Sequence, residues 1–182
     1  MVLGQVKTDE KSNEITAIPE RLKGLELKGC LVTIDAMGCQ KKIAKTIIEQ
    51  EADYLLALKD NQPKLHQAVQ DYFAQASKVA FEGYKIDFDE TNDKGHGRIE
   101  TRCCWVGYDA LDKIDSLENW EGFKTVVMVE SERTFKEETT IEHRYYISSA
   151  ENTAERFLNA SREHWGIETS WLFPVRYCFS GR

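Results

Sequence analysis

The sequence predicts a mixed α/β domain with a β-rich insertion before its last helix. Apolar runs at Cys30–Ile34 and Ala52–Leu58 each end in a polar loop and lead into a helical pattern, which indicates two strand–helix units in tandem. After about Phe81 the pattern changes to strands, and helical periodicity returns at Thr153–Glu168. The 182 residues suffice for one hydrophobic core and a smaller insertion.

The chain is expected to open with a short strand and a helix. Val2–Lys7 reads as a strand, and because it begins almost at the first residue we expect more chain upstream. Ser12 or Asn13 can cap a helix at Glu14–Leu25, whose apolar residues recur at helical spacing.

The two buried strands are each followed by a helix, expected at Gln40–Gln50 and Leu65–Ser77. Loops are expected at Asn92–Gly97 and around Glu137. The insertion contains four further expected strands, at Lys85–Glu90, Arg98–Val106, Lys124–Ser131 and Ile141–Ser148. The tail Ser170–Arg182 has no clear period and predicts neither a helix nor a strand.

Composition places the chain among ordinary globular proteins of the cytoplasm. The net charge of -7 argues weakly against a dedicated non-specific nucleic-acid binder, although a local basic face stays compatible with it. No apolar run approaches the roughly 18 residues of a membrane span, and no signal peptide is evident. The five cysteines show no zinc-like spacing, so we expect reduced thiols.

Asp35 is the first candidate for chemistry. It ends the apolar run Leu31–Ile34, and an α/β fold commonly presents an acid to a ligand at the carboxyl end of a buried strand. The functional interpretation is a metal ligand or a general base. The structural interpretation, equally compatible with the local sequence, is an Asp that caps the following turn.

Other polar side chains allow a functional and a structural interpretation in the same way. Glu168 is a late helix acid that could also be a solvated surface residue. Lys59 and Asn61 follow the second buried strand, where α/β folds bind ligands, or they form a turn that ends at a proline.

Basic residues recur on the strands of the insertion. His96, Arg98 and Arg102 share one face of an expected strand, together with Glu100. They suit either a charged solvent face or a ribbon that contacts phosphates. Arg144, followed by two tyrosines, fits an edge strand or a stacking and phosphate contact.

Several motifs resemble the DDE-class insertion-sequence transposases of bacteria, and within them the group that includes the H-repeat-associated proteins. The resemblance runs from Val2 to about Glu168 with the motifs in family order and spacing. Its strings are VLGQVKTDEKSNEITAIPE, VTIDAMGCQ, DYLLALKDNQP, DKGHGRIETR, RYYISSA and HWGIE.

The resemblance implies an RNase H-like core in residues 1–80 and 150–170, a β-rich insertion in residues 81–149, and a tail outside the family pattern in residues 171–182. It also implies three carboxylates that hold two Mg²⁺ or Mn²⁺ ions for attack on a DNA phosphodiester. By position Asp35 is similar to the second Asp of the family and Glu168 to its Glu.

The resemblance further implies double-stranded DNA as the partner, no membrane, and by analogy a homodimer that pairs two transposon ends in the bacterial cytoplasm. Residues at other motif positions are expected to contact DNA or to support the site. They are Lys59, Asn61, His96, Arg98, Arg102, Arg144, His164 and Trp165.

The sequence also departs from the family pattern. The first family Asp belongs to an Asp-Gly-Lys motif upstream of the strand at Val2, and Asp9 is no substitute for it. Asp60 stands where Gly is usual, and Thr169 where Asn follows the Glu. Past Ser170 the family segments do not appear, which a frame change or truncation near residue 169 would explain.

The related Tyr-Arg-Glu-Lys signature is not met, because its other three places are occupied by Ser161, His164 and Val175. Together these features predict a transposase fragment with little or no strand cleavage. The alternatives are a DNA-binding remnant or pseudogene product without catalysis, and a general RNase H-like nuclease.

Overall fold

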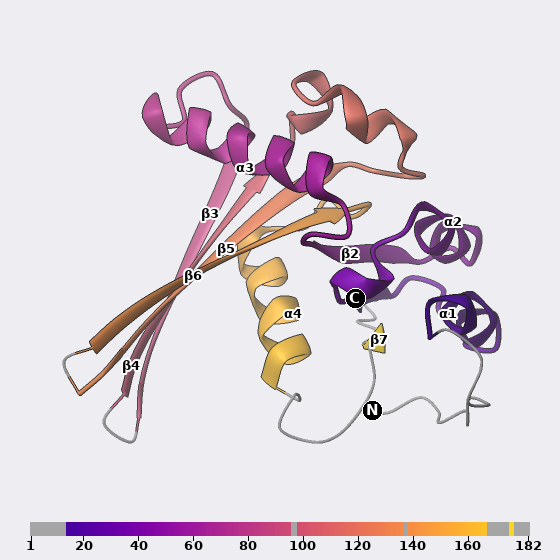
Figure 1. Cartoon of the computed structure of the whole chain (residues 1–182), viewed down its shortest axis with the longest axis horizontal. Helices are drawn as coiled ribbons and strands as arrows, with labels where there is room; N and C mark the ends of the chain where they lie inside the picture. Colours follow the sequence, from indigo (N-terminus) through magenta and orange to yellow (C-terminus); the bar gives the residue numbers. More distant parts are fainter. Residues whose placement is uncertain (1–13, 96–97, 137, 167–174, 177–182) are drawn as a thin grey trace.

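A computed structural model of the chain describes residues 14–95, 98–136, 138–166 and 175–176. Within them seven strands form one sheet in the order β3-β4-β5-β6-β2-β1-β7 (Figure 1). The strands are β1 (Leu31–Ile34), β2 (Asp53–Leu58), β3 (Ile86–Gly95), β4 (Arg98–Gly107), β5 (Thr125–Phe135), β6 (Glu138–Ser148) and β7 (Val175–Arg176). The predicted mixed α/β class is therefore confirmed.

Helices cover both faces of the sheet. The helices are α1 (Glu14–Lys23), α2 (Lys41–Glu49), α3 (Pro63–Lys78) and α4 (Ala154–Gly166), with short 3₁₀ helices η1 (Ala36–Gly38), η2 (Ala110–Asp112) and η3 (Asp115–Asn119). Leu22, Ile47 and Phe73 bring α1, α2 and α3 into one buried cluster, while Phe157 and Leu158 of α4 belong to a second. None of these described helices is long and apolar enough to cross a membrane.

The sheet is continuous from β3 to β1. The strands β3, β4, β5 and β6 form an antiparallel meander, and β6 pairs antiparallel with β2. The strand β2 in turn lies parallel to β1, as expected of two strand–helix units in tandem. The division of the chain into a core and an insertion stays a prediction, since β6 and β2 share one hydrogen-bonded ladder.

The strands of the meander are longer than the sequence predicts. Asn92–Gly97 was expected to be a loop, but β3 continues to Gly95, and β5 and β6 extend to a hairpin around residue 137. Polar pairs across the strands hold these extensions, such as Thr101 Oγ1 to Asn92 Oδ1 at 2.7 Å. Figure 1 shows the ends of these strands reaching away from the helices. The expected loop is therefore wrong for its first four residues.

One cysteine differs from expectation. Cys30 is disulfide-bonded, so the expectation of reduced thiols is wrong at this position. Cys39, Cys103 and Cys104 are free. A disulfide depends on two Cα atoms lying within about 7 Å of each other, which cysteine spacing in a sequence does not reveal.

Candidate active site

Asp35 lies at the carboxyl end of β1, as predicted. All four residues of β1 are buried, and Asp35 is half-buried where the chain leaves the sheet. Its Oδ1 accepts a hydrogen bond from the N–H of Gly38 at 3.3 Å, so Asp35 caps the short helix η1. Within the described residues this is the one hydrogen bond to the carboxylate that the structure shows. The predicted turn cap is thus present, and it occupies one carboxylate oxygen.

The turn after Asp35 is packed too closely for any residue but glycine at position 38. A Cβ on Gly38 would lie 2.3 Å from Cγ2 of Ile34 and 3.3 Å from Cδ1 of Ile18. The first distance is far below a normal contact between carbon atoms. Gly38 therefore allows the turn to lie directly on the core, and this fixes the position of Asp35.

The loop after β2 holds the turn after β1. Asn61 Nδ2 donates to the carbonyl of Ala36, and also to that of Cys39 at 3.4 Å. Gln62 Nε2 donates to the same Cys39 carbonyl at 3.1 Å. Because β1 and β2 are parallel, their carboxyl ends meet at one edge of the sheet. The structure therefore brings Asn61 and Asp35 into one loop cluster.

The thiol of Cys39 is not a candidate nucleophile. Cys39 lies within this cluster but is fully buried, and the burial raises the pKa of its thiol to about 12. A thiol with this pKa stays protonated at neutral pH, whereas the thiolate is the reactive form. Its contribution is packing under the turn.

His164 ties α4 to β1. Its Nδ1 lies 3.1 Å from Oγ1 of Thr33, and both residues are buried. Thr33 lies in β1 two positions before Asp35, so His164 contacts the strand close to its carboxyl end. The contact therefore places the end of α4 beside the strand that leads to Asp35.

Helix α4 lies along β3. The N–H of Ala154 donates to Asp87 Oδ2 near the start of β3 at 2.7 Å, and Arg162 pairs with Asp93 further along β3 at 2.6 Å. The helix therefore follows the direction of β3. Four antiparallel steps lead from β3 to β2, which is parallel to β1, so the carboxyl ends of β3 and β1 lie toward the same edge of the twisted sheet.

Glu168 lies outside the described residues. In the sequence it follows His164 by four positions. Trp165 falls in the last turn of α4.

Lys59 and Arg144 lie at the same end of the sheet as Asp35. The last pair between β2 and β6 is Leu58 with Tyr145, and Lys59 and Arg144 are the next residues on these two strands. Lys59 is exposed, and the side chain of Arg144 pairs with Glu142 at 2.8 Å.

Arg102 lies further away, on β4, with three strands between it and β1. Its guanidinium is largely buried and pairs with Glu100 at 2.8 Å and with Asp93 at 3.4 Å. These contacts favour a structural role in the charged layer under α4. Arg98 opens β4 opposite Gly95, and His96 lies outside the described residues.

Some residues of the site were not predicted from the sequence. Gln62 and Gly38 shape the turn beside Asp35, and Thr33 joins it to α4. Thr33 gave a usable signal, because it is a polar residue inside an otherwise apolar buried run. Asp87 and Asp93 hold α4 from a distant strand, and nothing in the sequence indicated these contacts.

The described residues do not by themselves form a metal site. No group of three or more His, Cys, Asp or Glu side chains suited to a metal ion occurs among them. Asp35 is the one predicted carboxylate ligand that the described residues supply, and Mg²⁺ needs several oxygen ligands in a near-octahedral arrangement.

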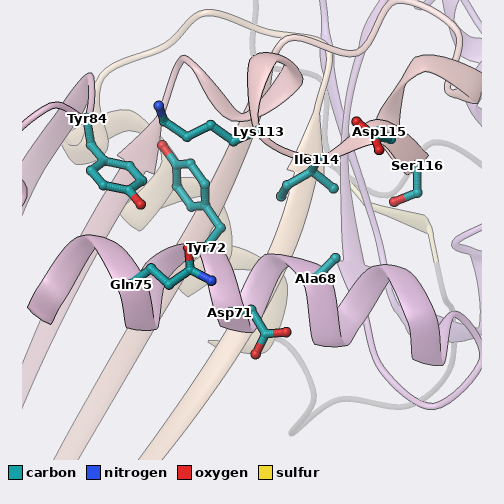
Figure 2. Close-up of a pocket in the computed structure, with 9 residues that line it drawn as sticks. All are labelled: Ala68, Asp71, Tyr72, Gln75, Tyr84, Lys113, Ile114, Asp115 and Ser116. Atoms are coloured by element: carbon teal, nitrogen blue, oxygen red, sulfur yellow. The ribbon is translucent and has the colours of Figure 1, made fainter.

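A pocket in the described residues lies elsewhere, between α3 and the segment η2–η3 (Figure 2). It has a volume of about 540 Å³ and none of the predicted site residues lines it. Some of its lining residues make contacts that hold this region together: Tyr72 donates to Asp109 at 2.5 Å, and the Lys113 ammonium lies 4.8 Å from the centre of the Tyr84 ring. This arrangement indicates a structural contact between α3 and η2.

Comparison with known proteins agrees with the arrangement of motifs. The chain is 48% identical over 181 residues to "Putative transposase YncI" of Escherichia coli O157:H7, which covers 97% of this chain and 46% of that protein. It is 44% identical over 183 residues to "H repeat-associated putative transposase YhhI" of Escherichia coli K12, covering 96% of this chain and 47% of that protein. The chain thus spans about half the length of the curated relatives that it matches.

No solved structure matches the chain. The family described as the transposase DDE domain matches residues 1–172. With relatives this similar over most of its length, the chain belongs to the DDE-domain transposase family.

Proposed function

We propose that the chain carries part of the catalytic core of an insertion-sequence transposase with an RNase H-like fold. The observation that carries the proposal is the contact between Thr33 and His164. It anchors the end of α4 beside β1, whose carboxyl end carries Asp35, and Glu168 follows His164 by four positions in the sequence. Family, fold class and this contact together support a site at the carboxyl ends of β1 and β2.

Asp35 and Glu168 would hold divalent metal ions, Mg²⁺ or Mn²⁺. When bound, such ions would activate the hydroxyl that attacks a DNA phosphodiester and would stabilise the oxygen that leaves. A half-buried carboxylate with one oxygen held by Gly38 N–H is pre-oriented to offer its other oxygen. The first carboxylate of the family pattern is not among these 182 residues.

The remaining site residues take supporting roles in this proposal. Asn61 holds the turn beside Asp35, and His164 holds α4 against β1. Lys59 and Arg144 are the basic groups at the same end of the sheet and would contact DNA. The other assignments from the family pattern, to His96, Arg98, Arg102 and Trp165, stay as proposed, with the side chain of Arg102 engaged by Glu100 and Asp93.

The chain on its own is proposed to have little strand-cleavage activity, because two carboxylates hold metal ions less well than three. The test is a nicking assay on transposon-end DNA with Mg²⁺ or Mn²⁺. We expect little or no nicking by these 182 residues. Strong metal-dependent nicking that Asp35→Ala abolishes would show that the carboxylates within the chain suffice.

A second candidate is a remnant that binds DNA without cleaving it. The observation that favours it is that these 182 residues contain no Asp-Gly-Lys motif, which carries the first carboxylate in the family pattern. Its test is to titrate the chain with transposon-end DNA and with random DNA at several salt concentrations, where no binding would indicate a pseudogene product without function. Equal affinity for both sequences with a steep salt dependence would indicate phosphate contacts alone.

Dimerisation and the division into an RNase H-like core, residues 1–80 and 150–170, and an insertion, residues 81–149, belong to the same proposal. Their support is the family resemblance, and the tail at residues 171–182 is assigned to neither part.

A further inference from the structure

We infer that Lys41, Lys42 and Lys64, together with Lys59, form a surface that contacts the DNA backbone beside Asp35. The inference rests on the proposed function, because it names the phosphate contacts of the same site. It departs from the family assignment in three of these residues, since only Lys59 stands at a motif position.

The four lysines gather at one end of the sheet. Lys41 and Lys42 begin α2, which follows the turn after β1, and Lys59 and Lys64 lie just after β2 and at the start of α3. The two segments are joined, because Gln62 Nε2 donates to the carbonyl of Cys39 at 3.1 Å. All four side chains belong to exposed residues.

The acids in the same stretch of chain are mostly engaged elsewhere. Glu49 pairs with Lys45, and Glu51 with Lys28 at 2.5 Å. Asp53 accepts a hydrogen bond from Ser149 Oγ at 2.7 Å. The first turns of α2 and α3 contain no acidic residue.

As a result, the four lysines have no carboxylate partner in the described part of the chain. Lys23, Lys28, Lys45 and Lys113 do have such partners. Asp60, and Asp35 beside the surface, are the acids that remain near these four lysines. The outcome is a net positive surface on a protein whose formal charge is -7.

A DNA backbone fits such a surface. Exposed ammonium groups without internal partners gain most from phosphates, since each contact releases condensed counterions from the duplex. Contacts to phosphate position a duplex without reading its sequence. The place of the surface beside Asp35 would hold the DNA on one side of the reacting phosphodiester.

The test compares two triple variants of the whole chain. Lys41→Ala, Lys42→Ala and Lys64→Ala remove the three new residues of the surface. The control carries Lys78→Ala, Lys85→Ala and Lys124→Ala, three exposed lysines at the opposite end of the sheet with no ion pair in the described residues. Both variants remove three positive charges, so the overall electrostatic attraction between protein and DNA falls equally in the two.

The measurement is fluorescence anisotropy of a labelled DNA duplex of random sequence over a range of salt concentrations. We expect the surface variant to lose about 100-fold in affinity near 0.1 M salt, and its salt slope to fall by about 1 for each lysine removed. The control variant should stay within about threefold of the wild type, because distant exposed charges are screened over about 10 Å at this salt.

Equal weakening of both variants, or an unchanged surface variant, would overturn this inference while leaving DNA binding by the chain intact. A wild-type chain that does not bind duplex DNA even at low salt would overturn the proposed function as well. Circular dichroism of both variants confirms that each is folded.

Discussion

At the scale of single residues, Asp35 is held by its neighbours in the turn. Gly38 donates to its Oδ1 and lets the turn lie on Ile34, while Asn61 fixes the turn from the next loop. A carboxylate held in this way loses little freedom when it binds a ligand, which is how rigid elements pre-organise a site.

A second acid gives a pH-dependent prediction. Asp109 is buried, which by itself would raise the pKa of its carboxyl. Hydrogen bonds from Tyr72 and the Lys85 backbone and the pair with Lys113 outweigh this and lower that pKa. Its contribution to stability is therefore present above the usual Asp pKa of about 4 and is lost as the pH falls through the lower folded-state pKa.

Replacing this acid should destabilise the protein in a pH-dependent way. We expect Asp109→Asn to lower the free energy of unfolding by about 1–2 kcal/mol at pH 7, with the difference from wild type shrinking below about pH 4. Urea unfolding at several pH values measures it. Asp71→Asn, an exposed acid on the neighbouring helix, is the control and should change stability by less than about 0.5 kcal/mol. A pH-independent loss in Asp109→Asn would contradict the account.

At the scale of elements, α4 is positioned by β3 as much as by β1. Asp87 accepts from the first N–H of α4, and Asp93 pairs with Arg162 near its end. These contacts come from the meander, whereas the contact of His164 with Thr33 comes from the strand–helix units. The placement of α4 therefore depends on both parts of the chain.

Removing the acid at the start of α4 should loosen this helix selectively. We expect Asp87→Ala to cost about 1 kcal/mol, the usual loss for a missing helix cap. Hydrogen exchange should become faster at the first amides of α4 and stay unchanged in α2. Asp89→Ala on the same strand is the control, since the side chain of Asp89 makes no hydrogen bond or ion pair in the described residues. Unchanged exchange in α4 would show that Asp87 does not position it.

The elements themselves were largely predictable, and their contacts were not. The apolar runs at Leu31–Ile34 and Asp53–Leu58 and the periodicity of α2, α3 and α4 depend on local pattern, which the sequence displays directly. The extensions of β3 and β5 depend on polar cross-strand pairs such as Arg133 with Glu100 at 2.6 Å, which local pattern does not indicate.

The site was predictable to a similar degree. Asp35 was found because a carboxylate directly after a buried strand is a recognisable pattern. The contact of Thr33 with His164 joins residues 131 positions apart, and the disulfide at Cys30 likewise depends on the folded chain. Such pairs follow from topology, which a local pattern does not specify.

At the scale of the whole molecule, one sheet carries both the strand–helix units and the meander. Asp35, Asn61 and Lys59 lie at the carboxyl ends of β1 and β2. Helix α4, which comes much later in the chain, contacts β1 close to this end through His164. The central claim is that Asp35 and Glu168 share a metal site at this end of the sheet.

The most direct measurement is a titration of the isotope-labelled chain with Mn²⁺, followed by paramagnetic broadening of its amide signals. We expect weak binding with broadening centred on the turn after Asp35 and on Asn61, lost in both Asp35→Asn and Glu168→Gln. Asp60→Asn, a change in an exposed acid of the adjacent loop, should leave it unchanged. Broadening centred elsewhere, or broadening at this turn that persists in both variants, would contradict the shared site.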